Sequence, residues 1–475
     1  MTCWSPPRRR LGDRPCGRSA GRWCREVSMS TSAVRSSRTE RLDDLPVSRE
    51  HVRLVWGSGI GWALDAFDVG LISFVLAQLA VTWQASPGEL SWIASLGFVG
   101  MAVGAALGGL LADRVGRRTV FALTLLVYGV ATGVSALAWS VAALAALRVV
   151  VGLGLGAELP VASTLVSEFA PRRVRGRAVV WLESFWALGW LLAAVVGFLV
   201  VPRGDDGWRW ALAIGAVPAV YAIVVRLGLP ESVRFLELRG RHREAELTVR
   251  RFERASGVET VGPLPADEPP GARERGSAWQ GVRSLWRPRL RRATGGLWTV
   301  WFFVNLSYYG AFIWIPTLLV AAGHTLTKSF EYTLIITLAQ LPGYAVAAWL
   351  IERWGRRRTL AVFLVGSALA AVGFGTAGST TAILVFGSLL SFFNLGAWGA
   401  LYAVTPEVYP TALRGTGAGW AAGAGRVASI LAPFLVAWLQ PRGVGLLFAV
   451  FAAAFAVAAA ATTALPERAG AALES

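Results

Sequence analysis

Long apolar runs alternate with short polar segments along most of the chain. Each run has close to the ~20 residues with which an α-helix crosses a bilayer. Six runs precede a longer polar segment and six follow it. They lie at 56–80, 90–112, 119–139, 141–166, 178–201, 208–229, 293–320, 330–351, 359–378, 381–404, 415–439 and 443–465. The pattern predicts an all-α membrane protein with twelve transmembrane helices.

The polar segments divide the chain into five regions. Residues 1–52 are basic and polar, and we expect them to be disordered. Six-helix bundles are expected at 53–229 and 293–466, joined by a cytoplasmic central loop at 230–292 with short amphipathic helices. Residues 467–475 form a short C-terminal tail.

Composition supports this class. Hydrophobic residues make up 55% of the chain and charged residues 16%, whereas soluble domains carry about a quarter charged residues. The net charge of +17 raises the possibility of nucleic-acid binding. We reject it, because the arginines cluster in short segments between apolar runs, as cytoplasmic loops do.

The placement of arginine predicts the orientation in the membrane. Clusters follow the second, fourth and eighth runs, whereas the loops on the other side are nearly free of charge. The clustered residues are Arg114, Arg117, Arg118, Arg172, Arg173, Arg175, Arg177, Arg353, Arg356, Arg357 and Arg358. Both termini are therefore expected in the cytoplasm, with the protein in the cell inner membrane.

The three cysteines, Cys3, Cys16 and Cys24, all precede Met29. No disulfide, metal site or cofactor is therefore expected among the membrane helices. The first 28 residues contain no apolar stretch typical of a signal peptide. We interpret Met29 as the true start of translation.

An internal repeat relates the two halves. Residues of the first half recur in the second at one constant interval. The matching pairs are Asp113 and Glu352, Gly116 and Gly355, Glu168 and Glu407, Pro171 and Pro410, and Arg175 and Arg414. Because each half has six spans, both have the same orientation and form parallel repeats.

These motifs resemble a known family. The Asp-Arg-Val-Gly-Arg-Arg loop at Asp113 and the Glu-Arg-Trp-Gly-Arg-Arg loop at Glu352 resemble the signature loop of the major facilitator superfamily. Residues 148–156 resemble its fourth-helix motif, and 230–234 (Pro-Glu-Ser-Val-Arg) is similar to the sugar-porter branch. The resemblance covers residues 50–470 and implies the major facilitator fold, a monomer and transport by alternating access.

The substrate motifs depart from those of sugar porters. The seventh span lacks the paired glutamine, the fifth has Glu183 in place of a glutamine, and the tenth reads Asn394-Leu-Gly-Ala-Trp398. These departures argue against a hexose. Asp65 and Asp68 of the first span, with the seventh and eighth spans, resemble aromatic-acid:proton symporters and bacterial niacin transporters.

The resemblance implies a non-enzymatic, proton-coupled importer of nicotinate or a related aromatic monocarboxylate. Uptake of another aromatic acid or a sugar-like metabolite, and efflux of drugs or metabolites by proton antiport, remain alternatives. A membrane enzyme would need a catalytic motif such as HExxH or GxSxG, and the sequence contains neither. A sensor without transport would usually carry an added cytoplasmic domain.

Ionisable residues inside a bilayer are costly, so each one suggests a function. The four carboxylates expected to be buried well inside the spans are the proton-coupling candidates, and they are Asp65, Asp68, Glu158 and Glu183. Arg148 and Arg426 keep their charge, and either could hold a substrate carboxylate. If each arginine pairs with one carboxylate, two carboxylates are left to bind a proton.

An aromatic face on the seventh span is the best candidate for binding a ring. Asn305, Tyr308 and Tyr309 share it by their spacing, whereas Trp298 and Trp301 are expected at the membrane interface. The full set of substrate-binding candidates is Asn305, Tyr308, Tyr309, Trp186, Gln340, Asn394, Arg426 and Arg148.

Charged residues of the repeated motifs are expected to act in gating. They are Asp113, Arg117, Glu168, Arg175, Glu352, Arg356, Glu407 and Arg414. We expect Asp113 near the start of the eleventh helix and Glu352 near the start of the fifth. Two glycine series, at 152, 154 and 156 and at 415, 419 and 423, predict close helix packing rather than nucleotide binding.

Overall fold

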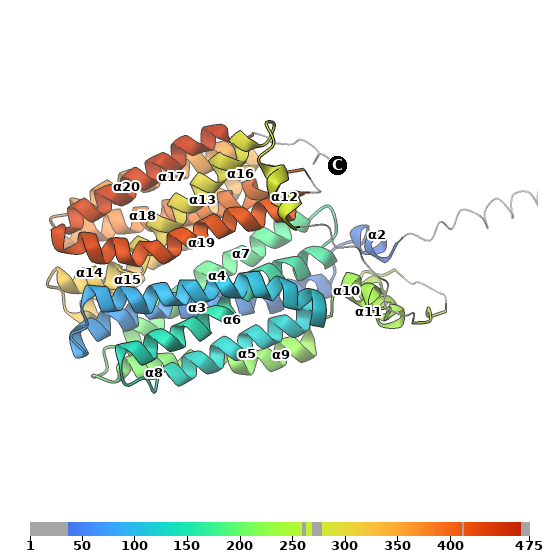
Figure 1. Ribbon diagram of the computed structural model, residues 1–475, viewed down its shortest axis with the longest axis horizontal. Helices are drawn as coiled ribbons and strands as arrows, with labels where there is room; N and C mark the ends of the chain where they lie inside the picture. Colours follow the sequence, from blue (N-terminus) through green and yellow to red (C-terminus); the bar gives the residue numbers. More distant parts are fainter. Residues whose placement is uncertain (1–36, 259–262, 268–277, 411–412, 467–475) are drawn as a thin grey trace, which may run out of the picture.

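A computed structural model describes residues 37–258, 263–267, 278–410 and 413–466. This part of the chain is built of helices joined by turns and loops. Two groups of long helices lie side by side, α3 to α9 in one and α13 to α20 in the other (Figure 1). The cysteines, Met29 and the tail at 467–475 lie outside the described residues.

The first group contains six spans. α3 packs against α7, α4 against α6, and α5 against both α6 and α9. Its sixth span is made of two consecutive helices, α8 and α9. The helices are α3 (Arg49–Thr82), α4 (Pro87–Val115), α5 (Arg117–Ser135), α6 (Val141–Phe169), α7 (Arg175–Val200), α8 (Gly207–Ile214) and α9 (Val217–Gly228).

The second group repeats these pairings. α13 packs against α19, α16 and α17 against α18, and α17 against α20. The helices are α13 (Arg291–Phe312), α14 (Ile315–Ala321), α15 (Leu326–Leu338), α16 (Gln340–Trp354), α17 (Arg356–Gly375), α18 (Thr380–Val404), α19 (Arg414–Leu439) and α20 (Val444–Ala461). Short 3-10 helices among the described residues are η1 (Thr405–Glu407), η3 (Gln440–Arg442) and η4 (Thr462–Ala464). The predicted parallel six-helix repeats are confirmed.

The seventh span is broken. Eleven helical segments of the described chain are long and apolar enough to cross a membrane, and α13 with α14 supplies a twelfth, bent by 46°. Pro316 lies in the first turn of α14. A proline there cannot donate to the preceding turn and its ring clashes with it, so the helix restarts in a new direction.

The repeated signature loops contain equivalent strained turns. Gly116 between α4 and α5 has φ 101°, and Gly355 between α16 and α17 has φ 87°, a region that side chains with a Cβ rarely adopt. Glu231 closes over the first turn, since its carboxylate accepts the backbone N–H of Arg118 at 3.1 Å and that of Ser232 at 3.0 Å. The Pro-Glu-Ser motif after the sixth span therefore anchors the loop after the second.

Glycines bring α4 and α6 into backbone contact. A Cβ on Gly100 would lie 2.2 Å from the carbonyl oxygen of Val149, and one on Gly156 would lie 1.9 Å from that of Met101. This agrees with the packing predicted for the first glycine series. The prediction for Gly415, Gly419 and Gly423 is wrong, because these three are exposed and a Cβ there would meet nothing within 4 Å.

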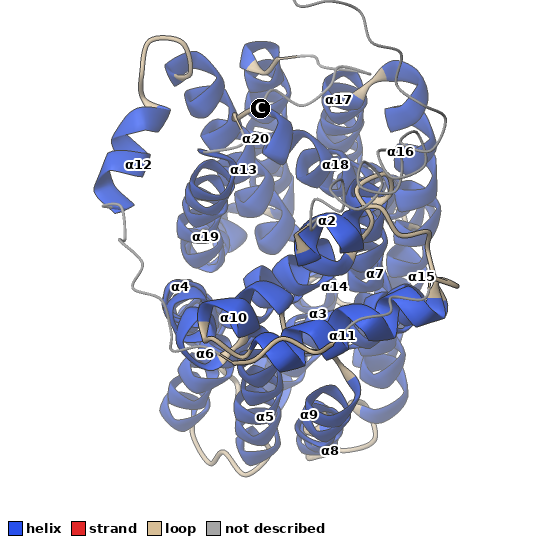
Figure 2. Cartoon of the chain, turned by 90° about the vertical axis from the view of Figure 1, so that its right-hand side faces the viewer, coloured by secondary structure: helices blue, strands red, loops and turns tan. Residues whose placement is uncertain are grey.

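Short helices gather at one end of the molecule, which we call the loop end (Figures 1 and 2). They are α2 (Arg38–Asp43), α10 (Val233–Leu238), α11 (His242–Ala255) and α12 (Ala278–Leu285). We refer to the opposite end of the helix bundle as the far end.

The expectation of disorder throughout 1–52 is wrong for its last part. α2 begins at a capping box formed by Ser37 and Glu40, and α3 already begins at Arg49. Arg38 pairs with Glu246 at 3.1 Å and Arg41 with Glu253 at 2.8 Å. A basic segment appears disordered from composition alone, but acidic partners on α11 order this one.

Candidate substrate site and buried charges

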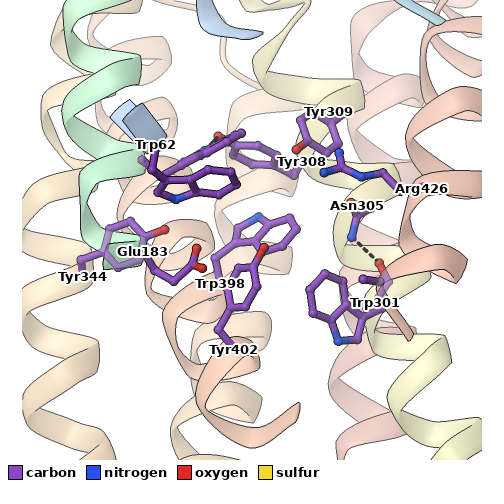
Figure 3. A pocket seen from close by; sticks show the side chains of 12 residues that line it. Trp62, Glu183, Trp301, Asn305, Tyr308, Tyr309, Tyr344, Trp398, Tyr402 and Arg426 are labelled. Atoms are coloured by element: carbon purple, nitrogen blue, oxygen red, sulfur yellow. Dashed lines mark hydrogen bonds between the residues drawn. The ribbon is translucent and has the colours of Figure 1, made fainter. Parts of the chain in front are cut away.

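A cavity lies between the two groups of helices. Figure 3 shows that its walls are mainly aromatic rings. The first group contributes α3 and α7, and the second contributes α13, α16, α18 and α19. The lining residues are Trp62, Glu183, Trp186, Trp301, Asn305, Tyr308, Tyr309, Tyr344, Trp398, Tyr402, Ala422 and Arg426.

The aromatic walls link the two halves. The Trp186 indole N–H donates to the Tyr308 hydroxyl at 3.1 Å, and the Trp186 ring lies 4.9 Å from that of Trp62. Tyr308 in turn lies 5.6 Å from the ring of Trp398. A planar aromatic ligand in the cavity could stack on the faces of these rings or meet their edges.

Two lining residues of opposite charge, Glu183 and Arg426, lie on opposite sides of the cavity (Figure 3). Arg426 is partly exposed and lies beside Tyr309, and its guanidinium contacts the Met101 sulfur at 3.8 Å. Among the described residues, no carboxylate lies within ion-pair distance of Arg426. Of the two arginines expected to be buried and paired, this one is available to a ligand.

Arg148 has a different environment. It is buried away from the cavity lining and forms an ion pair of 2.8 Å with Asp68. Asp68 also accepts a hydrogen bond from the Thr132 hydroxyl at 2.6 Å. The structure therefore places Arg148 in an internal ion pair and not against the cavity.

Asp65, one helical turn before Asp68, has no arginine beside it. Its carboxyl lies against that of Glu158, next to Tyr128. Both carboxyls are almost completely buried, and among the described residues neither forms an ion pair, so that the Tyr128 hydroxyl is the neighbouring donor. Adjacent carboxyls satisfy each other only when at least one of them carries a proton.

The amide candidates differ in their placement. Asn305 lines the cavity, but its amide donates to the Trp301 carbonyl at 2.7 Å and accepts from the Ser429 hydroxyl at 3.1 Å. Gln340 and Asn394 are fully buried, lie outside the cavity lining, and find no hydrogen-bond partner among the described residues.

The sequence reasoning missed part of the lining. Trp301, expected at the membrane interface, is buried against the cavity, because α13 turns this face toward α18 and α19. Trp398 and Tyr402 were not nominated, although their spacing of four residues puts them on one face of α18. A search for such aromatic pairs on the tenth span could have found them.

The gating candidates form equivalent contacts in the two halves. Arg117 lies 3.7 Å from Glu168 and 3.2 Å from Asp113, and at the repeated positions Arg356 pairs with Glu407.

The remaining gating candidates have partners at the loop end or are exposed. Arg175 pairs with Asp43, beside α2, and Arg414 donates to the Pro406 carbonyl at 2.8 Å. Glu352 is exposed, as is Asp113. The contacts described for these residues hold each half together, whereas the sequence suggested contacts of Asp113 and Glu352 across the halves.

Contacts between the halves lie at the level of the cavity and at the far end. There the Ser95 hydroxyl donates to the Ile430 carbonyl at 2.9 Å, and the rings of Trp92 and Phe434 lie 4.9 Å apart. Phe74 and Phe330 add a further ring contact at 5.1 Å. The two groups of helices are thus joined at the far end.

Comparison with known proteins identifies the fold and family. The family model described as "Sugar (and other) transporter" matches residues 59–475. A solved structure of the xylose transporter XylE from E. coli, in a partially occluded inward open conformation, superposes with a TM-score of 0.72. It covers 90% of this chain and 100% of its own at 18% identity, so this likeness concerns the fold alone.

Two similar sequences are bacterial. The niacin transporter NiaP of Acinetobacter baylyi is 49% identical over 396 residues, which is 83% of this chain and 89% of that protein. The putative niacin/nicotinamide transporter NiaP of Bacillus subtilis is 45% identical over 417 residues, 87% of this chain and 95% of that protein. The chain is therefore a multi-pass membrane transporter of the sugar (and other) transporter family, within the major facilitator superfamily.

Proposed function

We propose that the protein imports nicotinate, or a closely related aromatic monocarboxylate, together with a proton. The observation that carries this proposal is the cavity itself, in which aromatic walls surround an arginine that has no acidic partner in the described part of the chain. An aromatic ring can stack on such walls, and a guanidinium can hold a carboxylate through two parallel hydrogen bonds. The names of the two bacterial relatives point to the same substrate class.

The buried carboxyls support the proton-coupled part of the proposal. Asp65 and Glu158 share an environment without a cation, so ionising both would place two like charges side by side in a low dielectric. We assign them as the pair that gains and loses the transported proton. Asp68, one helical turn away, is held separately by Arg148 and Thr132. One proton moving with one monocarboxylate transfers no net charge.

The contact pattern supports alternating access. Contacts at the far end join the halves, so a substrate in the cavity would leave toward the loop end. The arginine clusters of the sequence favour the cytoplasm as the side of the loop end. We therefore assign the described arrangement to the state that faces the cytoplasm, in the inner membrane.

A sugar is the less favoured substrate. The seventh span lacks the paired glutamine of sugar porters, and the amide of Asn305, which lines the cavity, is already engaged with Trp301 and Ser429. Efflux by antiport would reverse the direction of movement, and an assay of transport direction distinguishes it.

The test is uptake of radiolabelled nicotinate into cells that express the full chain, in acidic and in slightly alkaline medium. We expect saturable uptake that is faster in acid and abolished by a protonophore. Benzoate should compete and xylose should not. If the protein is shown to be in the membrane and no uptake occurs in either medium, the proposal is wrong.

A further inference from the structure

One acidic residue of the cavity has no assigned role in binding. Glu183 on α7 is almost completely buried, yet it faces the cavity next to Trp62 and Tyr344 (Figure 3). Among the described residues no arginine, lysine or histidine forms an ion pair with it. Glu183 therefore differs from Asp68, which is held by an arginine, and from Asp65 and Glu158, which hold each other.

The position of Glu183 relative to Arg426 is informative. The two side chains come from different halves of the protein and lie on opposite sides of the same aromatic cavity (Figure 3). A ligand whose carboxylate is bound by Arg426 would extend its ring between the aromatic walls toward Glu183. The group at the other side of that ring then meets a carboxyl.

A neutral carboxyl can donate one hydrogen bond, and a pyridine-type nitrogen can accept one, whereas a ring C–H cannot. We propose that Glu183 donates a hydrogen bond to the ring nitrogen of the substrate, so that the site selects pyridine carboxylates over benzoates. This inference rests on the proposed function and specifies its substrate class. Arg426 recognises the acid, and Glu183 recognises the heterocycle.

The size of the effect follows from general energetics. A ligand without the nitrogen displaces water from the Glu183 carboxyl and offers it no hydrogen bond in return. Such a loss corresponds to a roughly tenfold to hundredfold weaker binding. We expect the chain to bind benzoate more weakly than nicotinate by that factor.

The experiment measures equilibrium binding to the purified full-length protein by competition against labelled nicotinate. The ligands are nicotinate, its two positional isomers, benzoate and nicotinamide. The variants are Glu183→Gln, Glu183→Ala and Arg426→Gln, with Glu331→Gln as a matched control because Glu331 pairs with Lys328 at 2.7 Å on α15 and does not line the cavity. Size-exclusion profiles check that each variant is folded.

The variants separate donation to the ligand from proton carriage. Glu183→Gln keeps an N–H donor but cannot carry a proton, so it should retain the preference for nicotinate over benzoate. Glu183→Ala should lose that preference and bind both at the level of benzoate. Arg426→Gln should lose the preference for nicotinate over nicotinamide. The Glu331→Gln control should match the unsubstituted protein.

Several outcomes would overturn the inference. Equal affinity of the unsubstituted protein for nicotinate and benzoate would refute recognition of the nitrogen and leave aromatic-acid transport standing. An unchanged preference in Glu183→Ala would assign Glu183 to proton carriage instead. If the folded protein binds none of the aromatic acids, the proposed function fails first. Because the ligand series is also measured on the unsubstituted protein, misfolding of a variant does not remove the test.

Discussion

Arg148 and Arg426 show how far single residues can be interpreted from sequence. Both lie in apolar spans, and sequence alone left open which one meets the substrate. The structure gives Arg148 a buried acidic partner, Asp68, and leaves Arg426 facing an aromatic cavity. The difference depends on which helix faces each side chain. Arg148 on α6 faces Asp68 on α3, whereas Arg426 on α19 faces Met101 on α4, and these helices lie far apart in the sequence.

The ion pair between Arg148 and Asp68 should be important for stability. Arg148→Gln leaves the Asp68 carboxylate buried without its cation, and breaking such a pair typically costs about 3–5 kcal/mol. We expect a clear drop in the thermal unfolding temperature in detergent. The double variant Arg148→Gln with Asp68→Asn should recover part of the loss, and no recovery would show that the two residues do not act as a pair.

The carboxyl pair makes a separate prediction about coupling. Asp65→Asn and Glu158→Gln remove a site for the transported proton but leave the cavity lining intact. Each variant should lose accumulation of nicotinate against a gradient and its dependence on external pH. Each should still exchange labelled for unlabelled nicotinate across the membrane. Accumulation that persists in both variants would contradict the assignment.

The sequence predicted the four intramembrane carboxylates because charged residues stand out in an apolar run. It could not predict their partners, since Asp65 and Asp68 share a helix face and still face different neighbours, Glu158 and Arg148. The aromatic residues were harder still. Sequence alone does not distinguish an interfacial position of Trp301 from a position in the cavity lining, because both environments suit an indole.

At the scale of elements, α2 and α11 form a charged contact outside the membrane helices. Burial by itself would raise the pKa of Glu246, but hydrogen bonds from Arg41, Arg250 and Arg38 outweigh it and lower that pKa to about 2. Because this pKa is lower in the folded protein, ionised Glu246 stabilises the contact at pH values above 4.5, the ordinary pKa of a glutamate. The stabilisation is lost as the pH falls from 4.5 toward 2. The contact should therefore be intact at neutral and mildly acidic pH.

Replacing that carboxylate tests the contact directly. Glu246→Gln removes the charge that Arg38 and Arg41 share and should weaken the docking of α2 by roughly 2 kcal/mol. We expect faster amide hydrogen exchange in α2 at neutral pH, with little change in the membrane helices. Glu237→Gln is the control, because that carboxylate is more exposed and pairs with Arg38 alone. Equal exchange in the two variants would argue against a central role for Glu246.

The contact between α4 and α6 allows a comparison within one helix. Gly100→Ala would place a methyl group 2.2 Å from the Val149 carbonyl and force the helices apart, whereas the space at Gly109 is open. We expect Gly100→Ala to destabilise the protein by about 1–3 kcal/mol and to lower transport. Gly109→Ala should be neutral or slightly stabilising, since alanine favours a helix over glycine. Thermal unfolding of both variants measures the difference.

At the scale of the whole molecule, the repeat in the sequence was sufficient to predict two similar halves. A pattern that recurs at a constant interval requires the same fold twice, and the helix pairings agree. The repeat could not indicate how the halves meet, because residues on facing surfaces need not resemble each other. The joined far end and the contacts of the gating residues within each half became visible only in three dimensions.

Opening of the far end can be tested by cross-linking. The rings of Trp92 and Phe434 face each other across the halves, and the three native cysteines precede Met29, so they can be replaced with serine. In that background, Trp92→Cys with Phe434→Cys should be joined by a short thiol-specific cross-linker. We expect joined protein to lose transport but to keep binding from the loop end. Each single-cysteine variant should be unaffected, and full transport by the joined protein would contradict alternating access.

Arg426, for which the described residues supply no acidic partner, also bears on how the carrier responds to membrane voltage. A fixed charge that shifts its position in the electric field exchanges roughly 2.3 kcal/mol with the field for each 100 mV that it crosses. A bound carboxylate moves with the guanidinium and cancels most of its charge. Voltage would then act on this arginine mainly during the return of the empty carrier. The resting potential would therefore affect the rate of that return step more than the rate of the substrate-bound step.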